Sequence, residues 1–151
     1  RKERLCGYMI KFVLGPSGSG KTKWLIDEAN KDKRERQGNI VFIDTDDSHI
    51  FTLDHKVRLI NAANFHIDCV NKLYGFLAGI ISRDYDIEKI YIDGIYEIID
   101  FKDEDTIKKL SDMVEVLSKE FEVNFYIGLN KKATELPAEL KENAVEVHYQ
   151  D

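Results

Sequence analysis

The feature that most constrains the fold of this chain is the segment GPSGSGKT, from Gly15 to Thr22. It follows directly on the apolar run MIKFVL and precedes a stretch with helical periodicity. Glycines let the backbone turn sharply, and the first turn of the helix then presents backbone N–H groups that have no partner within the helix. The segment therefore predicts a strand–loop–helix unit near the start of the chain.

The spacing of this segment matches the pattern G-x-x-x-x-G-K-[ST]. Inward-turned N–H groups and the positive end of a helix dipole bind phosphate. In such a loop Lys21 brings its ammonium to the β- and γ-phosphates, and the Thr22 hydroxyl is a ligand of Mg²⁺. A chance glycine-rich turn, the alternative, does not explain the strand before it and the helix after it. The predicted phosphate-binding residues are Gly15, Pro16, Ser17, Gly18, Ser19, Gly20, Lys21 and Thr22.

A second ligand of the metal ion is expected at the end of another buried strand. The run IYID ends in Asp93, and we predict that Asp93 binds Mg²⁺ together with Thr22. The alternative is an aspartate in a turn, because Asp-Gly is a common turn dipeptide. Asp44, which ends the run IVFID, is a rival for the same role. The expected cofactors are ATP and Mg²⁺.

Short apolar runs alternate with segments of helical period along the chain. Near-continuous apolar runs are typical of strands buried on both faces, as in a parallel sheet. The predicted strands are 8–14, 40–43, 87–92, 123–129 and 144–148. The segment 57–61 is ambiguous and is a candidate for a further edge strand. The predicted helices are 21–36, 68–82 and 105–121, with a short helix at 136–142. This alternation predicts an α/β fold, a three-layer sandwich around a mostly parallel sheet of five or six strands.

The length of 151 residues fits a single domain, which we place at 9–151. Residues 1–8 are interpreted as an N-terminal extension or a cloning remnant ahead of Met9. No apolar run has the ~18 residues that a membrane helix needs, so no membrane partner is expected. Cys6 and Cys69 lack a CxxC spacing, and we expect reduced thiols in a cytoplasmic protein. The net charge of −6 argues against passive coating of nucleic acid.

The order of these pieces resembles the RecA-like branch of P-loop ATPases, which includes recombinases, KaiC-type proteins and hexameric helicase cores. The resemblance covers most of 9–149. It rests on GPSGSGKT, FIDTD at 42–46, IYIDG at 90–94 and IGLN at 127–130. It implies a catalytic role for Lys21, an acid at Asp46 that orients the attacking water, and a γ-phosphate sensor at Asn130. It also implies a central phosphate-loop strand, with the 123–129 strand between it and the 87–92 strand, so that Asn130, Asp93 and Thr22 meet around one γ-phosphate.

The sequence departs from that family at several positions. Asp46 stands where the recombinases have a longer glutamate, and TDDS is also a good turn or capping sequence. Gly94 stands where many ATPases of this broad class carry a catalytic glutamate, with Glu97 close by in sequence. Lys131 stands where the recombinases have glutamine, and it either contacts phosphate or forms a solvated charge pair with Lys132.

The segments that follow Asp93 and Asn130 are short, whereas the recombinases use longer loops there to hold DNA. Basic and aromatic residues do not interleave within 130–143, as they do in single-strand stacking platforms. These observations argue against DNA binding by this chain alone. The expected partners are the nucleotide and either a protein or further copies of the chain, with Arg58 and Arg83 as candidate fingers for a neighbour's site.

Three functions fit this sequence. We favour a Mg-dependent ATPase or nucleotide switch with a RecA-like core. The second is a kinase that transfers phosphate from ATP to a small molecule or nucleotide bound at 45–68 or 94–104. The third is a nucleotide-binding module that does not hydrolyse. ATP is favoured over GTP because NKKA at 130–133 lacks the aspartate of a guanine-binding motif.

Overall fold

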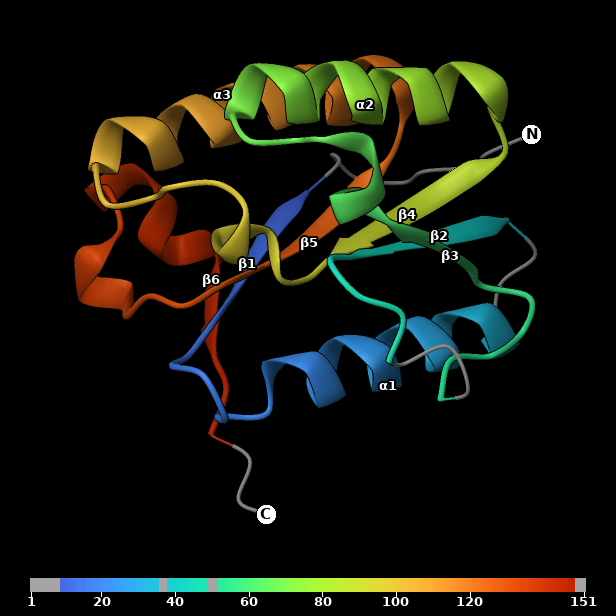
Figure 1. Ribbon diagram of the computed structural model, residues 1–151, viewed down its shortest axis with the longest axis horizontal. Helices are drawn as coiled ribbons and strands as arrows, with labels where there is room; N and C mark the ends of the chain where they lie inside the picture. The colour runs from blue at the N-terminus through green and yellow to red at the C-terminus, as the bar shows by residue number, and fades with distance from the viewer. Residues whose placement is uncertain (1–8, 36–37, 49–51, 149–151) are drawn as a thin grey trace.

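A computed structural model describes residues 9–35, 38–48 and 52–148 (Figure 1). Its strands are β1 (Ile10–Leu14), β2 (Asn39–Asp44), β3 (Arg58–Asn61), β4 (Ile87–Ile92), β5 (Asn124–Leu129) and β6 (Ala144–Glu146). Its α-helices are α1 (Lys21–Glu35), α2 (Val70–Arg83) and α3 (Glu104–Phe121). Short 3₁₀ turns lie at Ala62–Phe65, Ile95–Glu97, Ala133–Glu135 and Ala138–Asn143.

The predicted elements correspond to the observed ones. All five apolar runs contain strands, and the ambiguous segment 57–61 contains β3 at an edge of the sheet. Each predicted helix overlaps an observed one, and the short helix before the last strand is a 3₁₀ turn. The predicted strand residue at position 8 and helix residue at position 36 lie outside the described residues.

The described strands form one parallel sheet in the order β3-β2-β4-β5-β1-β6. The prediction that β5 lies between β1 and β4 is confirmed. The prediction that β1 is central is wrong, because β1 lies next to the edge strand β6. β6 is short and pairs with Phe12 to Leu14 alone, so β1 is nevertheless flanked by a parallel strand on both sides.

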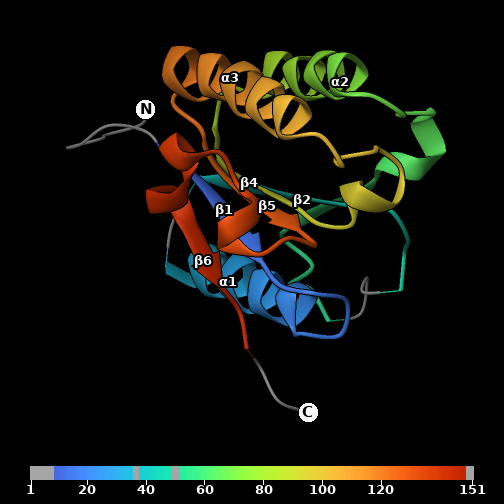
Figure 2. The same cartoon turned by 90° about the vertical axis from the view of Figure 1, so that its left-hand side faces the viewer.

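Three layers are visible in two perpendicular views (Figures 1 and 2), with α1 on one face of the sheet and α2 and α3 on the other. Each helix packs against the sheet because it carries an apolar stripe of helical period. Leu25, Ile26 and Ala29 of α1 pack with Phe42 and other residues of the sheet in the smaller core. The larger core contains the buried apolar residues of α2 and α3, including Leu73, Leu77, Ile107, Leu110 and Val114.

A buried polar cluster ties α1 to the sheet within the smaller core. The Lys89 ammonium lies 2.7 Å from the Asp32 carboxylate, and both side chains are about one-tenth exposed. The Tyr91 hydroxyl donates to the same carboxylate. The Tyr91 ring stacks on Tyr126 with centroids 4.8 Å apart. The helix that follows the glycine loop is therefore held to the sheet by charge and hydrogen bonding as well as by apolar contact.

The carboxyl ends of the strands form one edge of the molecule. Asp93, which follows β4, donates its backbone N–H to the Ile43 carbonyl of β2 at 2.8 Å, which joins the two strand ends. In open α/β sheets this edge is where ligands bind. Among the described residues, no helix is both long enough and apolar enough to cross a membrane.

Candidate functional site

The glycine loop joins β1 to α1 at this carboxyl edge. Gly18 and Gly20 have φ values of 82° and 95°, which lie in the left-handed region that side chains disfavour. The Ser19 N–H donates to the Pro16 carbonyl at 3.1 Å and closes a tight turn. β1, the loop and α1 thus form the strand–loop–helix unit of a P-loop.

Lys21, the first residue of α1, folds its side chain back over the loop. Its ammonium donates to the carbonyls of Gly15 at 2.6 Å and Pro16 at 3.0 Å, and the residue is 3% exposed. The ammonium also lies 5.3 Å from the centre of the Tyr96 ring. Burial lowers the pKa of Lys21, and the nearby Asp93 carboxylate opposes that shift. The Lys21 ammonium therefore places one positive charge against the backbone carbonyls of the loop.

Thr22 and Asp93 meet at the same place. The Thr22 hydroxyl donates to Asp93 Oδ2 at 2.6 Å, and Asp93 is 3% exposed. The other oxygen, Oδ1, is buried and has no hydrogen-bond partner within the described part of the chain. A buried oxygen of this kind carries a desolvation cost that a cation would relieve. A hydroxyl and a carboxylate are also the hard oxygen ligands that Mg²⁺ prefers, so these residues fit the ion.

A cavity of about 640 Å³ opens beside the loop. This volume lies within the range of small-ligand sites, ~300–1,000 Å³. Its lining combines loop residues with the first two turns of α1 and three residues from elsewhere in the chain. The lining residues are Ser17, Gly18, Gly20, Lys21, Thr22, Lys23, Ile26, Asp27, Thr52, Tyr96 and Glu97.

Tyr96 was not predicted as a site residue from the sequence, and Glu97 was noted only for its position after Asp93. Both lie on the short turn that follows Asp93 and Gly94 and face the glycine-loop cavity. Burial and the carboxylates of Asp93, Glu97 and Asp44 raise the pKa of Tyr96 to about 12. The tyrosine is therefore neutral at physiological pH. The Asp-Gly dipeptide signals a turn here, but nothing in the sequence shows where the two side chains point.

Thr52 was also missed by the sequence analysis. Asn30 of α1 holds the chain near it: its amide nitrogen donates to the Thr52 carbonyl at 3.0 Å, and its oxygen accepts from the Asp54 N–H at 2.7 Å. These two bonds fasten the segment after β2 to α1. Because they join residues more than twenty positions apart, no local pattern reveals them.

Asp46 and Asp44 take different positions after β2. Asp46 is exposed, accepts from the Ser48 N–H at 2.8 Å and its hydroxyl at 2.6 Å, and is not among the described residues that line the glycine-loop cavity. The segment TDDS therefore has the turn conformation that the alternative interpretation predicts. Asp44 is 4% exposed, and its Oδ1 accepts from the Thr45 N–H at 2.7 Å.

Asn130 lines a neighbouring cavity of about 460 Å³ and is not among the residues around Lys21. The two cavities share Tyr96 and Glu97 as a wall. Lys131 also lines the neighbouring cavity and lies 3.9 Å from Glu135, within ion-pair distance. The structure thus brings Thr22 and Asp93 together, whereas Asn130 lines the neighbouring cavity.

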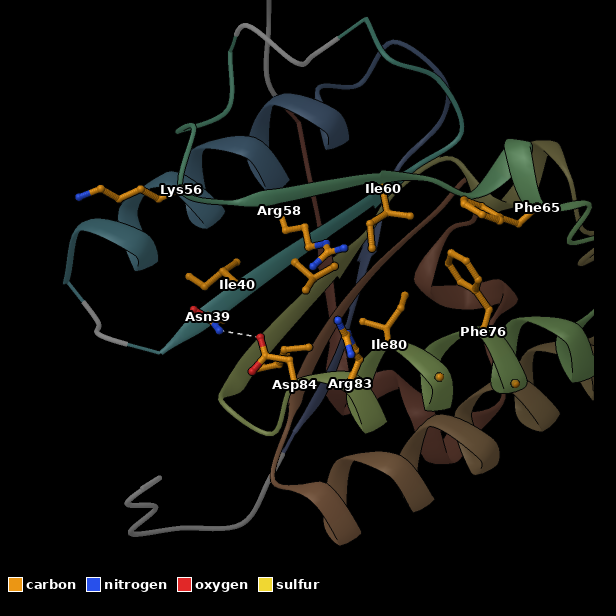
Figure 3. Close-up of a pocket in the computed structure, with 14 residues that line it drawn as sticks. Asn39, Ile40, Lys56, Arg58, Ile60, Phe65, Phe76, Ile80, Arg83 and Asp84 are labelled. Atoms are coloured by element: carbon orange, nitrogen blue, oxygen red, sulfur yellow. Dashed lines mark hydrogen bonds between the residues drawn. The ribbon is translucent and has the colours of Figure 1, made fainter.

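The candidate fingers Arg58 and Arg83 lie elsewhere. Arg58 begins β3 and Arg83 ends α2, and both line a third cavity that shares no residue with the glycine-loop cavity. Their side chains point into that cavity rather than toward the loop of their own chain (Figure 3).

No family model and no curated protein sequence matches the chain. Among solved structures, the AMPPCP-bound DnaA from Aquifex aeolicus is similar over 93% of this chain, with 14% identity and a TM-score of 0.43. A structure described as a DNA replication initiation factor is similar over the same share, with 14% identity and a TM-score of 0.44. The match covers 40% of each of those chains. At this level the likeness carries no argument about function, and the fold class rests on the sheet and loop described above.

Proposed function

We propose that this protein binds a nucleoside triphosphate, ATP, together with Mg²⁺, and acts as an ATPase or nucleotide switch with a RecA-like core. One observation carries the proposal: the buried ammonium of Lys21 and the Thr22–Asp93 pair meet at the glycine loop. A cation, a hydroxyl and a carboxylate at the start of a helix are the groups that a metal-bound triphosphate requires.

The Lys21 ammonium is the group that would contact the β- and γ-phosphates. It now bonds two neutral carbonyls, those of Gly15 and Pro16. A phosphate oxygen is the stronger acceptor because it carries a negative charge that attracts the ammonium. The loop N–H groups and the dipole of α1 add further positive potential at the same point. Binding therefore rests on groups that the fold already holds in place.

Thr22 and Asp93 would hold the metal ion. When bound, Mg²⁺ neutralises charge on the phosphate oxygens. The residues' own contribution is to present a hydroxyl and a carboxylate whose positions are fixed by a 2.6 Å contact between α1 and the end of β4.

Two acids are candidates for orienting an attacking water. Asp46 is the candidate from the family resemblance, and hydrolysis through it would require the turn with Ser48 to open or re-form toward the nucleotide. Glu97 is the candidate from the geometry, because it lines the cavity that contains Lys21 and Thr22. Glu97→Gln and Asp46→Asn, each assayed for turnover and for ATP affinity, separate the two. Replacement of the acid that orients the water should abolish turnover and leave the affinity for ATP unchanged.

The structure also supports one feature of the kinase alternative. The cavity of about 460 Å³ beyond Tyr96 contains two lysines, Lys102 and Lys131, next to the acids Glu97 and Asp100. An acceptor bound there would lie across the Tyr96–Glu97 wall from the phosphates. Acceptor-dependent consumption of ATP, lost in Lys102→Ala, would favour phosphate transfer over hydrolysis.

The test of the proposed function is ATP turnover with Mg²⁺ over a range of protein concentration, with Lys21→Ala as the inactive control. Specific activity that rises with concentration means that neighbouring copies complete the site. ATP binding without turnover at any concentration favours the switch or the module that does not hydrolyse. Equal ATP affinity in Lys21→Ala and the unmodified protein would overturn the assignment of the loop.

A further inference from the structure

A third cavity, of about 700 Å³, lies between α2 and the outer strands β2 and β3 (Figure 3). The segment that joins β2 to β3 packs with α1 on the opposite face of the sheet, through Leu53 and Val57, so it does not cover this part of the sheet. Ile60 of β3 and Ile80 of α2 reach into the cavity from opposite walls. Gly75 and Gly79 of α2 line it as well, and a Cβ added to either would meet no atom within 4 Å.

Two arginines enter this apolar cavity from opposite sides. Figure 3 shows the guanidinium groups of Arg58 and Arg83 converging near its centre. Neither forms an ion pair or a hydrogen bond within the described part of the chain. Asp84 is the one carboxylate among the described lining residues, and both of its oxygens are engaged, by Asn39 at 2.6 Å and by the Asp86 N–H at 2.9 Å. Two exposed guanidinium groups thus lie near each other without a direct ion pair, in a chain whose net charge is −6.

The cavity is bounded at both ends. The rings of Phe65 and Phe76 contact each other at one end, with centroids 5.3 Å apart. The hydrogen bond between Asn39 and Asp84 spans the other end (Figure 3). The volume of about 700 Å³ lies within the range of small-ligand sites, ~300–1,000 Å³.

We propose that this cavity binds an anionic amphiphile, a small molecule with a carboxylate or phosphate head and an apolar body. The head lies between Arg58 and Arg83, whose planar guanidinium groups can each donate two parallel hydrogen bonds to such a group. The apolar body lies along Ile60, Ile80 and Phe76. This site is separate from nucleotide binding, because the two cavities share no residue.

The first test uses decanoate as the probe, added to the full chain in competition with the fluorescent sulfonate 1-anilinonaphthalene-8-sulfonate. We expect saturable binding of the sulfonate at one site and its displacement by decanoate. Arg58→Gln and Arg83→Gln should each weaken decanoate about tenfold, since each removes a charge-assisted pair. Arg34→Gln, which removes the same charge from the end of α1 on the opposite face of the sheet, should change nothing.

Uncharged decanol should displace the sulfonate far less well than decanoate does. Displacement of the sulfonate by decanol as effectively as by decanoate would overturn the assignment of the head group to Arg58 and Arg83. The same conclusion would follow if all three arginine variants bound decanoate with equal affinity. Absence of saturable binding would overturn the proposal as a whole.

A second variant locates the site without removing charge. Gly79→Leu fills the cavity from the α2 wall, and the residue is helical, so the fold should be retained. Asn71→Leu adds the same side chain on an exposed position of α2 that does not line the cavity. We expect Gly79→Leu to abolish decanoate binding with an unchanged or higher urea midpoint, and Asn71→Leu to bind normally. Unchanged binding in Gly79→Leu would contradict the location. ATP affinity should be unaffected in both variants, so failure here is distinguishable from failure of the nucleotide assignment.

Discussion

The Thr22 hydroxyl donates to the Asp93 carboxylate at 2.6 Å, although 71 positions separate the two residues in the chain. Thr22 is the second residue of α1, which follows β1, and Asp93 follows β4, with β5 lying between those two strands. The contact is therefore a product of the strand order rather than of local sequence. It leaves Asp93 Oδ1 buried without a hydrogen-bond partner among the described residues. That arrangement is the basis of the first prediction.

Replacing Asp93 by Asn should remove the effect of Mg²⁺ on nucleotide affinity. The amide has a similar shape but lacks the charge that holds the ion, so ATP affinity with Mg²⁺ should fall to that measured with EDTA. Calorimetric titration with and without Mg²⁺ makes the comparison. Asp27→Asn is the matched control, because Asp27 also lines the cavity but pairs with Lys23. A full Mg²⁺ effect in Asp93→Asn would contradict the role given to this carboxylate.

The affinity for metal-free ATP should depend on alkaline pH through Lys21. Burial lowers the pKa of this lysine from its ordinary value of 10.5, so the protein without nucleotide begins to lose the ammonium below that pH. ATP binding requires the charged form, and affinity should therefore fall as pH rises through the lowered pKa, by at most a factor of ten per pH unit. Lys21→Ala should lack this dependence.

The free energy of unfolding should change in the opposite direction over the same pH range. Where Lys21 has a lower pKa in the folded than in the unfolded chain, the unfolded chain binds more protons, and stability due to this group rises with pH up to about 10.5. Urea unfolding of the unmodified protein and of Lys21→Ala isolates the contribution of this residue. A contribution that falls with pH would mean that the folded protein raises the pKa instead.

Breaking the buried pair of Asp32 and Lys89 should destabilise the fold strongly. Asp32→Ala leaves the Lys89 ammonium buried without its carboxylate, which costs about 3–5 kcal/mol of unfolding free energy. The double variant Asp32→Leu with Lys89→Met removes both charges and should lose much less. Urea unfolding measures both. Equal losses in the single and double variants would show that the cost comes from packing rather than from an uncompensated charge.

Glycine-to-alanine changes at two positions should have opposite effects on stability. Gly94 has a φ of 73°, and an added Cβ would lie 2.5 Å from the Thr45 hydroxyl and 3.3 Å from Asp44 Oδ1, so Gly94→Ala should cost at least about 1 kcal/mol. Gly75 is helical with open space around it, so Gly75→Ala should gain about 0.5–1 kcal/mol. Urea midpoints of the two variants provide the comparison. A neutral Gly94→Ala would show that the turn after Asp93 can relax.

Much of the fold could be predicted because its signals are local. Apolar runs located five of the described strands, the ambiguous segment 57–61 contains β3, and helical stripes such as Ile107, Leu110 and Val114 located the helices. The position of β5 between β1 and β4 was predicted from the family resemblance. The position of β1 was not predicted correctly, because the number of strands beyond it depends on how residues 144–146 pair, and so short a run carries no pairing signal.

The residues of the candidate site that lie in contiguous sequence motifs were predicted. The residues that reach the site through tertiary contacts were missed. The glycine loop and the aspartate at the end of β4 are readable because each is a contiguous motif. Tyr96 and Glu97 depend on the direction of a 3₁₀ turn, and Thr52 depends on two hydrogen bonds from Asn30. The buried Asp32–Lys89 pair was invisible, because an aspartate in a charged helix and a lysine in a strand each suggest a surface position in isolation.

The most direct test of the account is the affinity for ATP with Mg²⁺, measured by calorimetry on the unmodified protein and on two lysine variants. Lys21→Ala removes the ammonium that bonds the Gly15 and Pro16 carbonyls, whereas Lys31→Ala removes an exposed lysine of the same helix outside the cavity. We predict saturable binding to one site in the unmodified protein and in Lys31→Ala, and a loss of at least about a hundredfold in Lys21→Ala. Equal affinity in all three proteins would contradict the assignment of the glycine loop as a triphosphate site.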